Sequence, residues 1–170
     1  MPDIALRLVQ DSDHDALFAF HTAPGMMKKV GISSYDASDR DAFDALLNRL
    51  RVDKSVVLRA ITRDGEVVGS IVAQDTGRIP QIGFVIDPAH WGEGIATAAL
   101  IAFTAMMKRR PLQAVVASDN AAAIRVLEKA GFARINTRES LAPEHDAPAA
   151  EHVHELGFFP APTFTGTVIT

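Results

Sequence analysis

The chain has 170 residues, of which 48% are hydrophobic, and its formal net charge is −4 at pH 7. This length and apolar content predict one folded domain over residues 1–170 with a sizeable core, and they exclude a mostly disordered chain. The negative charge argues against non-specific binding to nucleic acid, which requires a basic face.

Cysteine is absent, which excludes disulfides, zinc–thiolate sites and a cysteine nucleophile. The N-terminal residues lack the basic start and the long apolar segment of a signal peptide. The most apolar run, 95–107, is too short to span a bilayer. We therefore expect a cytoplasmic protein with no nucleic-acid or membrane partner.

The first third of the chain predicts one strand and two helices. Apolar residues at 4–9 indicate an opening strand, and Ser12 and Asp15 are spaced like a capping box for a helix that ends near His21. Segment 26–35 shows no periodicity, so we predict a loop there. The second helix is predicted from one apolar stripe at helical spacing, formed by Phe43, Leu46, Leu47 and Leu50.

The middle of the chain predicts three strands that run antiparallel to one another. Segments 55–62 and 66–73 flank Asp64-Gly65, which is a strong hairpin signal. The third strand, Gln81–Ile86, has apolar residues at period two. It ends at Asp87-Pro88, because proline cannot donate to a strand ladder.

A helix starting near Gly94 and a strand at Leu112–Ala117 come next. Together with the strand before them they predict a right-handed parallel crossover. Asp119 or Asn120 caps a further helix, which ends just before Gly131.

The C-terminal part predicts two more strands, at 132–136 and 151–156. Between them, segment 140–150 is rich in proline, alanine and acidic residues, and we expect a mobile loop. Residues 158–170 are predicted to form an extended tail, whose apolar composition is compatible with a homodimer contact.

The turn Gly92-Glu93-Gly94 joins the third of the antiparallel strands to the helix after it. A strand that runs through glycines into a helix leaves free backbone N–H groups at the positive end of the helix dipole, which together form a phosphate site. A P-loop requires Gly-Lys-Ser/Thr, which is missing. A dinucleotide fingerprint requires a third glycine where this chain has Thr97.

With this order of elements, the sequence Trp91-Gly92-Glu93-Gly94-Ile95-Ala96 and the later Asn120…Leu127-Glu128-Lys129-Ala130-Gly131-Phe132 resemble the GNAT family of acetyl-CoA-dependent N-acetyltransferases. The chain looks most like the subgroup that contains the ribosomal-protein N-terminal acetyltransferases, which also holds enzymes for small amines and antibiotics. The resemblance covers about Ile4 to Ile135. It implies an α/β (α+β) fold with a central mixed, mostly antiparallel sheet and helices on both faces.

The resemblance also implies where coenzyme A binds. Backbone N–H groups of the turn would hold its pyrophosphate, at Trp91, Gly92, Glu93, Gly94, Ile95, Ala96 and Thr97. The strand residues Phe84, Val85 and Ile86 would pair with the pantetheine arm, and Asn120 would contact that arm or its ordered water. Trp91 stands where the family has Arg or Gln, which removes a cation but keeps the backbone donors.

Residues for acid–base chemistry are scarce in this sequence. Many relatives carry a glutamate where this chain has Gln81, and the family's acid positions, a tyrosine and a serine, match Leu127 and Ala123. An α-amine with a pKa of about 7.8 has a sizeable neutral fraction at neutral pH, whereas a lysine amine with a pKa of about 10.4 is almost wholly charged. A site without a strong base therefore suits α-amines better than lysine.

Three residues remain as catalytic candidates, and each has a second explanation. Asp87 ends a strand and is typical of an Asp-Pro turn, and Tyr35 is the only tyrosine but could simply pack its loop. His152 is a candidate general base because histidine as a residue type suits that role, yet together with His154 it could instead bind a metal or belong to a solvated edge strand. Asn120 is also explained as a helix N-cap.

We therefore predict an N-acetyltransferase that moves the acetyl group of acetyl-CoA to a primary amine, either a protein N-terminal α-amine or a small amine. The amine would attack directly in a ternary complex, with the carbonyl polarised by a backbone N–H near Val85. We expect no metal. The alternative is a non-catalytic acyl-CoA-binding sensor or regulatory module, which the missing glutamate, tyrosine and serine favour.

Overall fold

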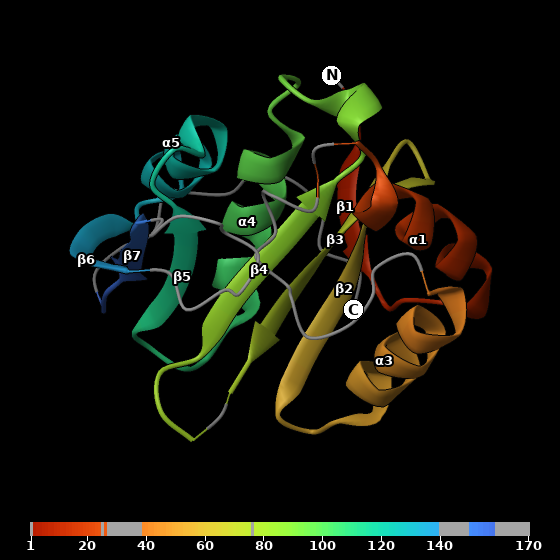
Figure 1. The fold of residues 1–170 in the computed structure, drawn as a ribbon, viewed down its shortest axis with the longest axis horizontal. Coiled ribbons are helices and arrows are strands. Elements are labelled where there is room, and N and C mark those ends of the chain that lie inside the picture. The colour runs from red at the N-terminus through yellow and green to blue at the C-terminus, as the bar shows by residue number, and fades with distance from the viewer. Residues whose placement is uncertain (1, 25, 27–38, 76, 140–149, 159–170) are drawn as a thin grey trace.

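The computed structural model describes residues 2–24, 26, 39–75, 77–139 and 150–158, and it contains one seven-stranded sheet in the order β1-β2-β3-β4-β5-β7-β6 (Figure 1). The strands are β1 (Ile4–Arg7), β2 (Val56–Arg63), β3 (Glu66–Gln74), β4 (Gln81–Ile86), β5 (Leu112–Ala117), β6 (Ala133–Glu139) and β7 (Ala150–Leu156). The helices are α1 (His14–Thr22), α3 (Arg40–Val52), α4 (Ile95–Met106) and α5 (Ala121–Lys129), with short 3-10 turns η1 (Asp11–Asp13) and η2 (Pro88–His90).

Helices cover both faces of this sheet, as the resemblance implied. On one face, α4 packs against β1, β3 and β4, and α5 packs against β5. The fully buried side chains of that core include Leu6, Ile61, Leu100, Phe103 and Leu112. On the other face, α1 packs against β3 and β4, and α3 packs against β2. In the described ranges, no helix combines the length and apolar character needed to cross a bilayer.

The sequence correctly predicted the central part of the sheet. β2, β3 and β4 pair antiparallel in order. The hairpin between β2 and β3 turns at Asp64 and Gly65, with φ values of 51° and 89° that suit a two-residue turn of positive φ. The pairing of β4 with β5 is parallel, as the crossover prediction required. Gly131 follows α5 with a φ of 92°, which is the left-handed conformation expected after a helix end.

The start of α1 differs from the prediction. The reciprocal capping contacts join Gln10 and Asp13 around η1, rather than Ser12 and Asp15, and α1 itself begins at His14. The Asp13 carboxylate accepts a hydrogen bond from the Gln10 N–H at 2.8 Å and forms an ion pair with Arg7 at 2.6 Å. Arg7 on β1 therefore pairs with Asp13, and this contact could not be predicted from the spacing of Ser12 and Asp15.

The C-terminal strands differ from the prediction in extent. β6 reaches Glu139 rather than 136, because its pairing with β7 continues to Glu139↔Ala150. β7 lies between β5 and β6 and pairs antiparallel with both. Most of the predicted loops at 26–35 and 140–150, and nearly all of the tail at 158–170, lie outside the described residues.

Candidate functional site

β4 and β5 are in register at one position only. Gln81 aligns with Gln113, and the Gln113 N–H donates to the Pro80 carbonyl at 2.9 Å. In contrast, β4 pairs with β3 along its whole length, from Gln81 to Ile86. Toward their C-terminal ends β4 and β5 therefore spread apart, and Figure 1 shows the two arrows diverging. The sheet has a slot that is closed at Gln81 and open beyond Ile86.

Backbone groups line this slot. The Asp87 N–H donates to the Val68 carbonyl on β3 at 2.8 Å, so the alternation of an antiparallel ladder turns the backbone groups of Val85 toward β3. The backbone groups of Phe84 and Ile86 point to the opposite side, toward β5. Of the three strand residues implied by the resemblance, Phe84 and Ile86 thus face the slot. A backbone donor for a carbonyl in the slot belongs to one of these two rather than to Val85.

The glycine turn stands at the open end of the slot. Gly92 and Gly94 have φ values of 81° and 78°, which disfavour any residue with a Cβ. Gly94 is the N-cap of α4 and has no side chain to cap it, so the N–H groups of Ile95, Ala96 and Thr97 precede the first helical hydrogen bond, from the Ala98 N–H to the Gly94 carbonyl. Among the described residues nothing lies within 4 Å of a Cβ built on either glycine, so the space above the turn is open.

The turn carries one acidic side chain whose charge is balanced locally. The Glu93 carboxylate lies 3.3 Å from Arg63 Nη2 at the end of β2 and 3.4 Å from His90 Nδ1. An anion bound at the N-terminus of α4 therefore meets a neutralised side chain rather than a bare carboxylate. Arg63 could not be predicted from the sequence, because only the fold brings it to a residue 30 positions further along the chain.

Trp91 and Asn120 hold the two borders of the slot. The Trp91 indole N–H donates to the Ile86 carbonyl at 3.0 Å, at the end of β4. Asn120 follows β5 and is the N-cap of α5, where its Oδ1 accepts a hydrogen bond from the Ala123 N–H at 3.2 Å. Capping uses the side-chain oxygen of Asn120, so its amide Nδ2 is the group that can donate to a ligand.

The two catalytic candidates that the structure describes, Asp87 and His152, make separate contacts on different elements. The Asp87 carboxylate accepts a hydrogen bond from the Ala89 N–H at 3.0 Å, which is the turn-forming role that the sequence offered as its second explanation. Tyr35 lies outside the described residues. His152 lies on β7, where its Nδ1 is 3.0 Å from the Thr137 hydroxyl. The catalytic roles of Asp87, Tyr35 and His152 stay predictions from the sequence.

His152 and His154 share one face of β7, with ring centroids 6.3 Å apart. His154 is 1% exposed, and burial, reinforced by the charge of His152, lowers its pKa below the usual value. In the part of the chain that the structure describes, no group of three or more His, Cys, Asp or Glu residues is arranged to hold a metal ion.

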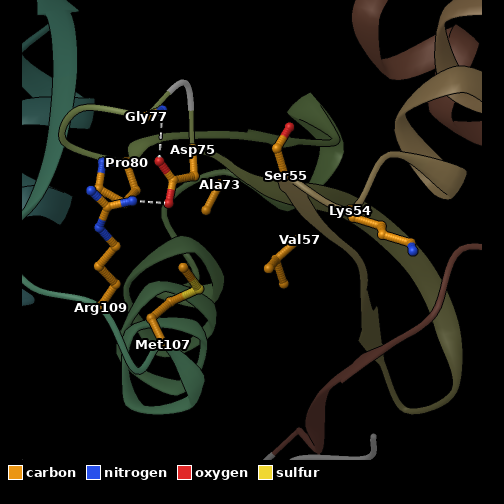
Figure 2. Close-up of a pocket in the computed structure, with 9 residues that line it drawn as sticks. All are labelled: Lys54, Ser55, Val57, Ala73, Asp75, Gly77, Pro80, Met107 and Arg109. Carbon is orange, nitrogen blue, oxygen red and sulfur yellow. Dashed lines mark hydrogen bonds and ion pairs between the residues drawn. The ribbon is translucent and has the colours of Figure 1, made fainter.

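A pocket of about 390 Å³ lies at the other end of α4 (Figure 2). Its charged lining groups include Asp75 and Arg109, which form an ion pair, while the Gly77 N–H also donates to Asp75 at 3.0 Å. Helix α4 has 12 residues and is therefore about 18 Å long. This pocket is thus separated from the glycine turn by the length of the helix.

This chain is similar in sequence to known proteins. The family model described as Acetyltransferase (GNAT) domain matches residues 3–133. The uncharacterized N-acetyltransferase YoaA of Bacillus subtilis (strain 168) is 26% identical over 167 residues, covering 90% of this chain and 92% of its own.

Two solved structures show the same fold. RimJ of Mycobacterium smegmatis, solved in complex with CoA-disulfide, superposes with a TM-score of 0.76 at 21% identity and covers 92% of this chain and 85% of its own. The spermidine N-acetyltransferase of Vibrio cholerae, solved with CoA and spermine, reaches a TM-score of 0.79 at 15% identity, with coverages of 91% and 95%. Because the family match spans most of the chain, this protein belongs to the GNAT family of acetyltransferases.

Proposed function

We propose that this protein transfers the acetyl group of acetyl-CoA to a primary amine, either a protein N-terminal α-amine or a small amine, by direct attack in a ternary complex. The observation that carries the proposal is the slot between β4 and β5, which has one registered pair at its closed end and an uncapped helix N-terminus at its open end. A cytoplasmic location and a homodimer through 158–170 belong to the same proposal as predictions from the sequence.

The turn residues bind the pyrophosphate in this proposal. The N–H groups of Ile95, Ala96 and Thr97 donate to its oxygens, and the helix dipole favours the negative charge. The left-handed glycines let the backbone approach closely. Arg63 offsets the Glu93 charge, so that the turn remains attractive to an anion.

The strand residues hold the thioester arm. Phe84 and Ile86 offer backbone groups to an extended amide-containing arm, in the way that a neighbouring strand would. Asn120 offers its amide nitrogen from the other side of the slot. The N–H of Phe84, which lies nearer the closed end of the slot than Ile86, then stabilises the carbonyl oxygen as it becomes negative.

The reaction forms one bond and breaks one. The amine nitrogen forms a bond to the acetyl carbon, the carbon–sulfur bond breaks, the nitrogen loses a proton, and the thiolate gains one. The reaction is easier with an α-amine than with a lysine amine. Removing the proton from the lysine nitrogen costs about 3.5 kcal/mol more at neutral pH.

A second candidate, a non-catalytic acyl-CoA-binding module, is favoured by one observation. At the family's acid positions, Leu127 is fully buried in the core and Ala123 has no titratable group. Neither residue can protonate the departing thiolate.

Two measurements separate these candidates. Titration calorimetry with coenzyme A tests the donor site, and a thiol-release assay tests acetyl transfer to an alanine-initiated peptide, spermidine and kanamycin. We expect binding and release of coenzyme A with at least one amine. Binding without release on any amine contradicts the enzyme and supports the binding module, whereas absence of binding contradicts both.

A further inference from the structure

Three polar side chains form a row across the sheet at the closed end of the slot. Gln81 on β4 aligns with Gln113 on β5, which aligns with Glu155 on β7. The Gln81 Nε2 donates to the Gln113 Oε1 at 3.2 Å, and the Gln113 Nε2 donates to the Glu155 Oε2 at 2.9 Å. The row thus ends in the Glu155 carboxylate, which is held in place by the Gln113 amide.

This row lies on the face of the sheet opposite α4 and α5. Each member of the row has an adjacent residue in its strand that is buried in the core beneath those helices, namely Ile82, Leu112 and Leu156. Because adjacent side chains on a strand point to opposite faces, the row itself points away from the helices. On the row's own face, α1 packs against β3 and β4, and α3 packs against β2. Gln81, Gln113 and Glu155 are each only half-buried, so a ligand on this face can reach them.

The slot leads to this row. Its open end, beyond Ile86, is where the proposed function places the pyrophosphate. Five residues separate Ile86 from Gln81, which is about 17 Å along a strand at roughly 3.3 Å per residue. An arm that enters at the turn and runs along β4 therefore carries its thioester toward the row.

The Glu155 carboxylate sets the orientation of the Gln113 amide. An ionised carboxylate can only accept, so the Gln113 amide must present its nitrogen to Glu155 and its oxygen to Gln81. Among the described residues, Gln113 is the hydrogen-bond partner of Glu155, and no Lys, Arg or His lies within ion-pair distance of it. The second carboxylate oxygen, Oε1, is thus available to accept from a ligand.

Glu151 provides a contrast on the same strand. It lies four residues earlier on the same face of β7, but it forms an ion pair with Arg138 at 3.2 Å. Glu151 is therefore neutralised by the neighbouring strand. Glu155 has no such cation beside it among the described residues, and it lies next to the only registered β4–β5 pair.

We propose that Glu155 is the carboxylate that receives the acceptor amine at the thioester, with Gln113 as its positioning residue. This inference rests on the proposed function and supplies the base that Gln81 cannot be. The amine donates a hydrogen bond to Glu155. Its nitrogen forms the bond to the acetyl carbon, Glu155 takes the proton that the nitrogen loses, and the carbon–sulfur bond breaks. The thiolate takes a proton from solvent, to which Glu155 returns its own.

The test compares E155Q with E151Q. The first replacement removes the charge of Glu155 but keeps an oxygen for Gln113, and the second removes a carboxylate from the same face of the same strand. Thiol release is followed with the alanine-initiated peptide, spermidine and kanamycin, and affinity for coenzyme A is measured by calorimetry on the same preparations. We expect E155Q to lose about 10²-fold in kcat/KM for the amine. Its affinity for coenzyme A should be unchanged, and E151Q should behave as wild type.

A third variant, Q113L, separates positioning from chemistry. It leaves the Glu155 carboxylate but removes the group that holds it, so we expect a higher KM for the amine with a smaller loss in kcat than E155Q. Retention of wild-type kcat/KM by E155Q overturns the inference while the proposed function stands. An equal loss in E151Q also overturns it, because the loss then reflects damage to β7. A wild-type protein that binds coenzyme A but acetylates none of the amines contradicts the proposed function, and this inference with it.

Discussion

Replacing Gly94 by alanine separates the cost of a strained turn from the cost of a blocked anion site. Gly94 has a φ of 78°, and a residue with a Cβ pays about 1–2 kcal/mol to adopt that conformation. In a domain of this size, that loss lowers Tm by about 2–8 °C. Among the described residues no atom lies within 4 Å of the added Cβ, so the substitution causes no clash within them.

The matched control is Gly77→Ala. Gly77 has a φ of 84° and equally open surroundings, but it lies at the pocket by the far end of α4. Both variants should therefore lose similar stability in thermal unfolding. Gly94→Ala alone should also lose about tenfold in affinity for coenzyme A, or about 1.4 kcal/mol, because its methyl group occupies the space that the pyrophosphate needs.

Calorimetry with coenzyme A, at a temperature where both variants are folded, gives the decisive comparison. If Gly94→Ala binds coenzyme A as tightly as wild type, the pyrophosphate is not at this turn. If Gly77→Ala loses the same affinity, the loss reflects general destabilisation, and the turn has no special role.

Three further predictions concern side chains around the slot and the core. R63Q should weaken binding of coenzyme A and E93Q should strengthen it, each by less than about tenfold because the pair is partly exposed, and the double variant, which removes both charges, should return near to wild type; calorimetry on all three tests this, and a double variant that binds as weakly as R63Q contradicts it. Asn120→Ala should cost about 1 kcal/mol in urea unfolding through loss of the α5 cap, and unchanged stability means that the cap is not needed. Burial, reinforced by the charge of His152, lowers the pKa of His154, so its contribution to stability is fully present above the unfolded value of about 6.5 and is lost as pH falls through the lowered folded value. H154Q should therefore flatten, but not abolish, the decline in stability between about pH 7 and pH 5, since burial also lowers the pKa of His21; an unchanged slope in urea unfolding contradicts this.

Local signals were enough to predict the glycine turn, the Asp64–Gly65 hairpin and an N-cap at Asp119 or Asn120, of which the structure uses Asn120. Each depends on a few consecutive residues whose backbone preferences the sequence displays directly. The strand β4 was predicted for the same reason, because its apolar residues recur at period two.

Three contacts between side chains that are distant in the sequence or on different elements were not predicted. Glu155 meets Gln113 only because β7 inserts between β5 and β6, and the sequence does not encode that order locally. The contact between Arg63 and Glu93 joins a hairpin to a turn in another part of the chain. Asp13 rather than Asp15 caps the first turn because Arg7 lies beside it.

Because β4 and β5 share only one registered pair, the sheet consists of two parts with continuous ladders that are weakly paired to each other. On one side are β1 to β4, joined by continuous ladders, and on the other are β5, β7 and β6. Across the seam the ladder stops at Gln81 and Gln113, while α4, which packs on β4, also packs against α5, which packs on β5. A donor that bonds to Phe84 and Ile86 on one edge and to Asn120 beyond the other acts as the missing strand of this sheet. Its binding energy then contributes to the folding stability of the protein as well as to the reaction.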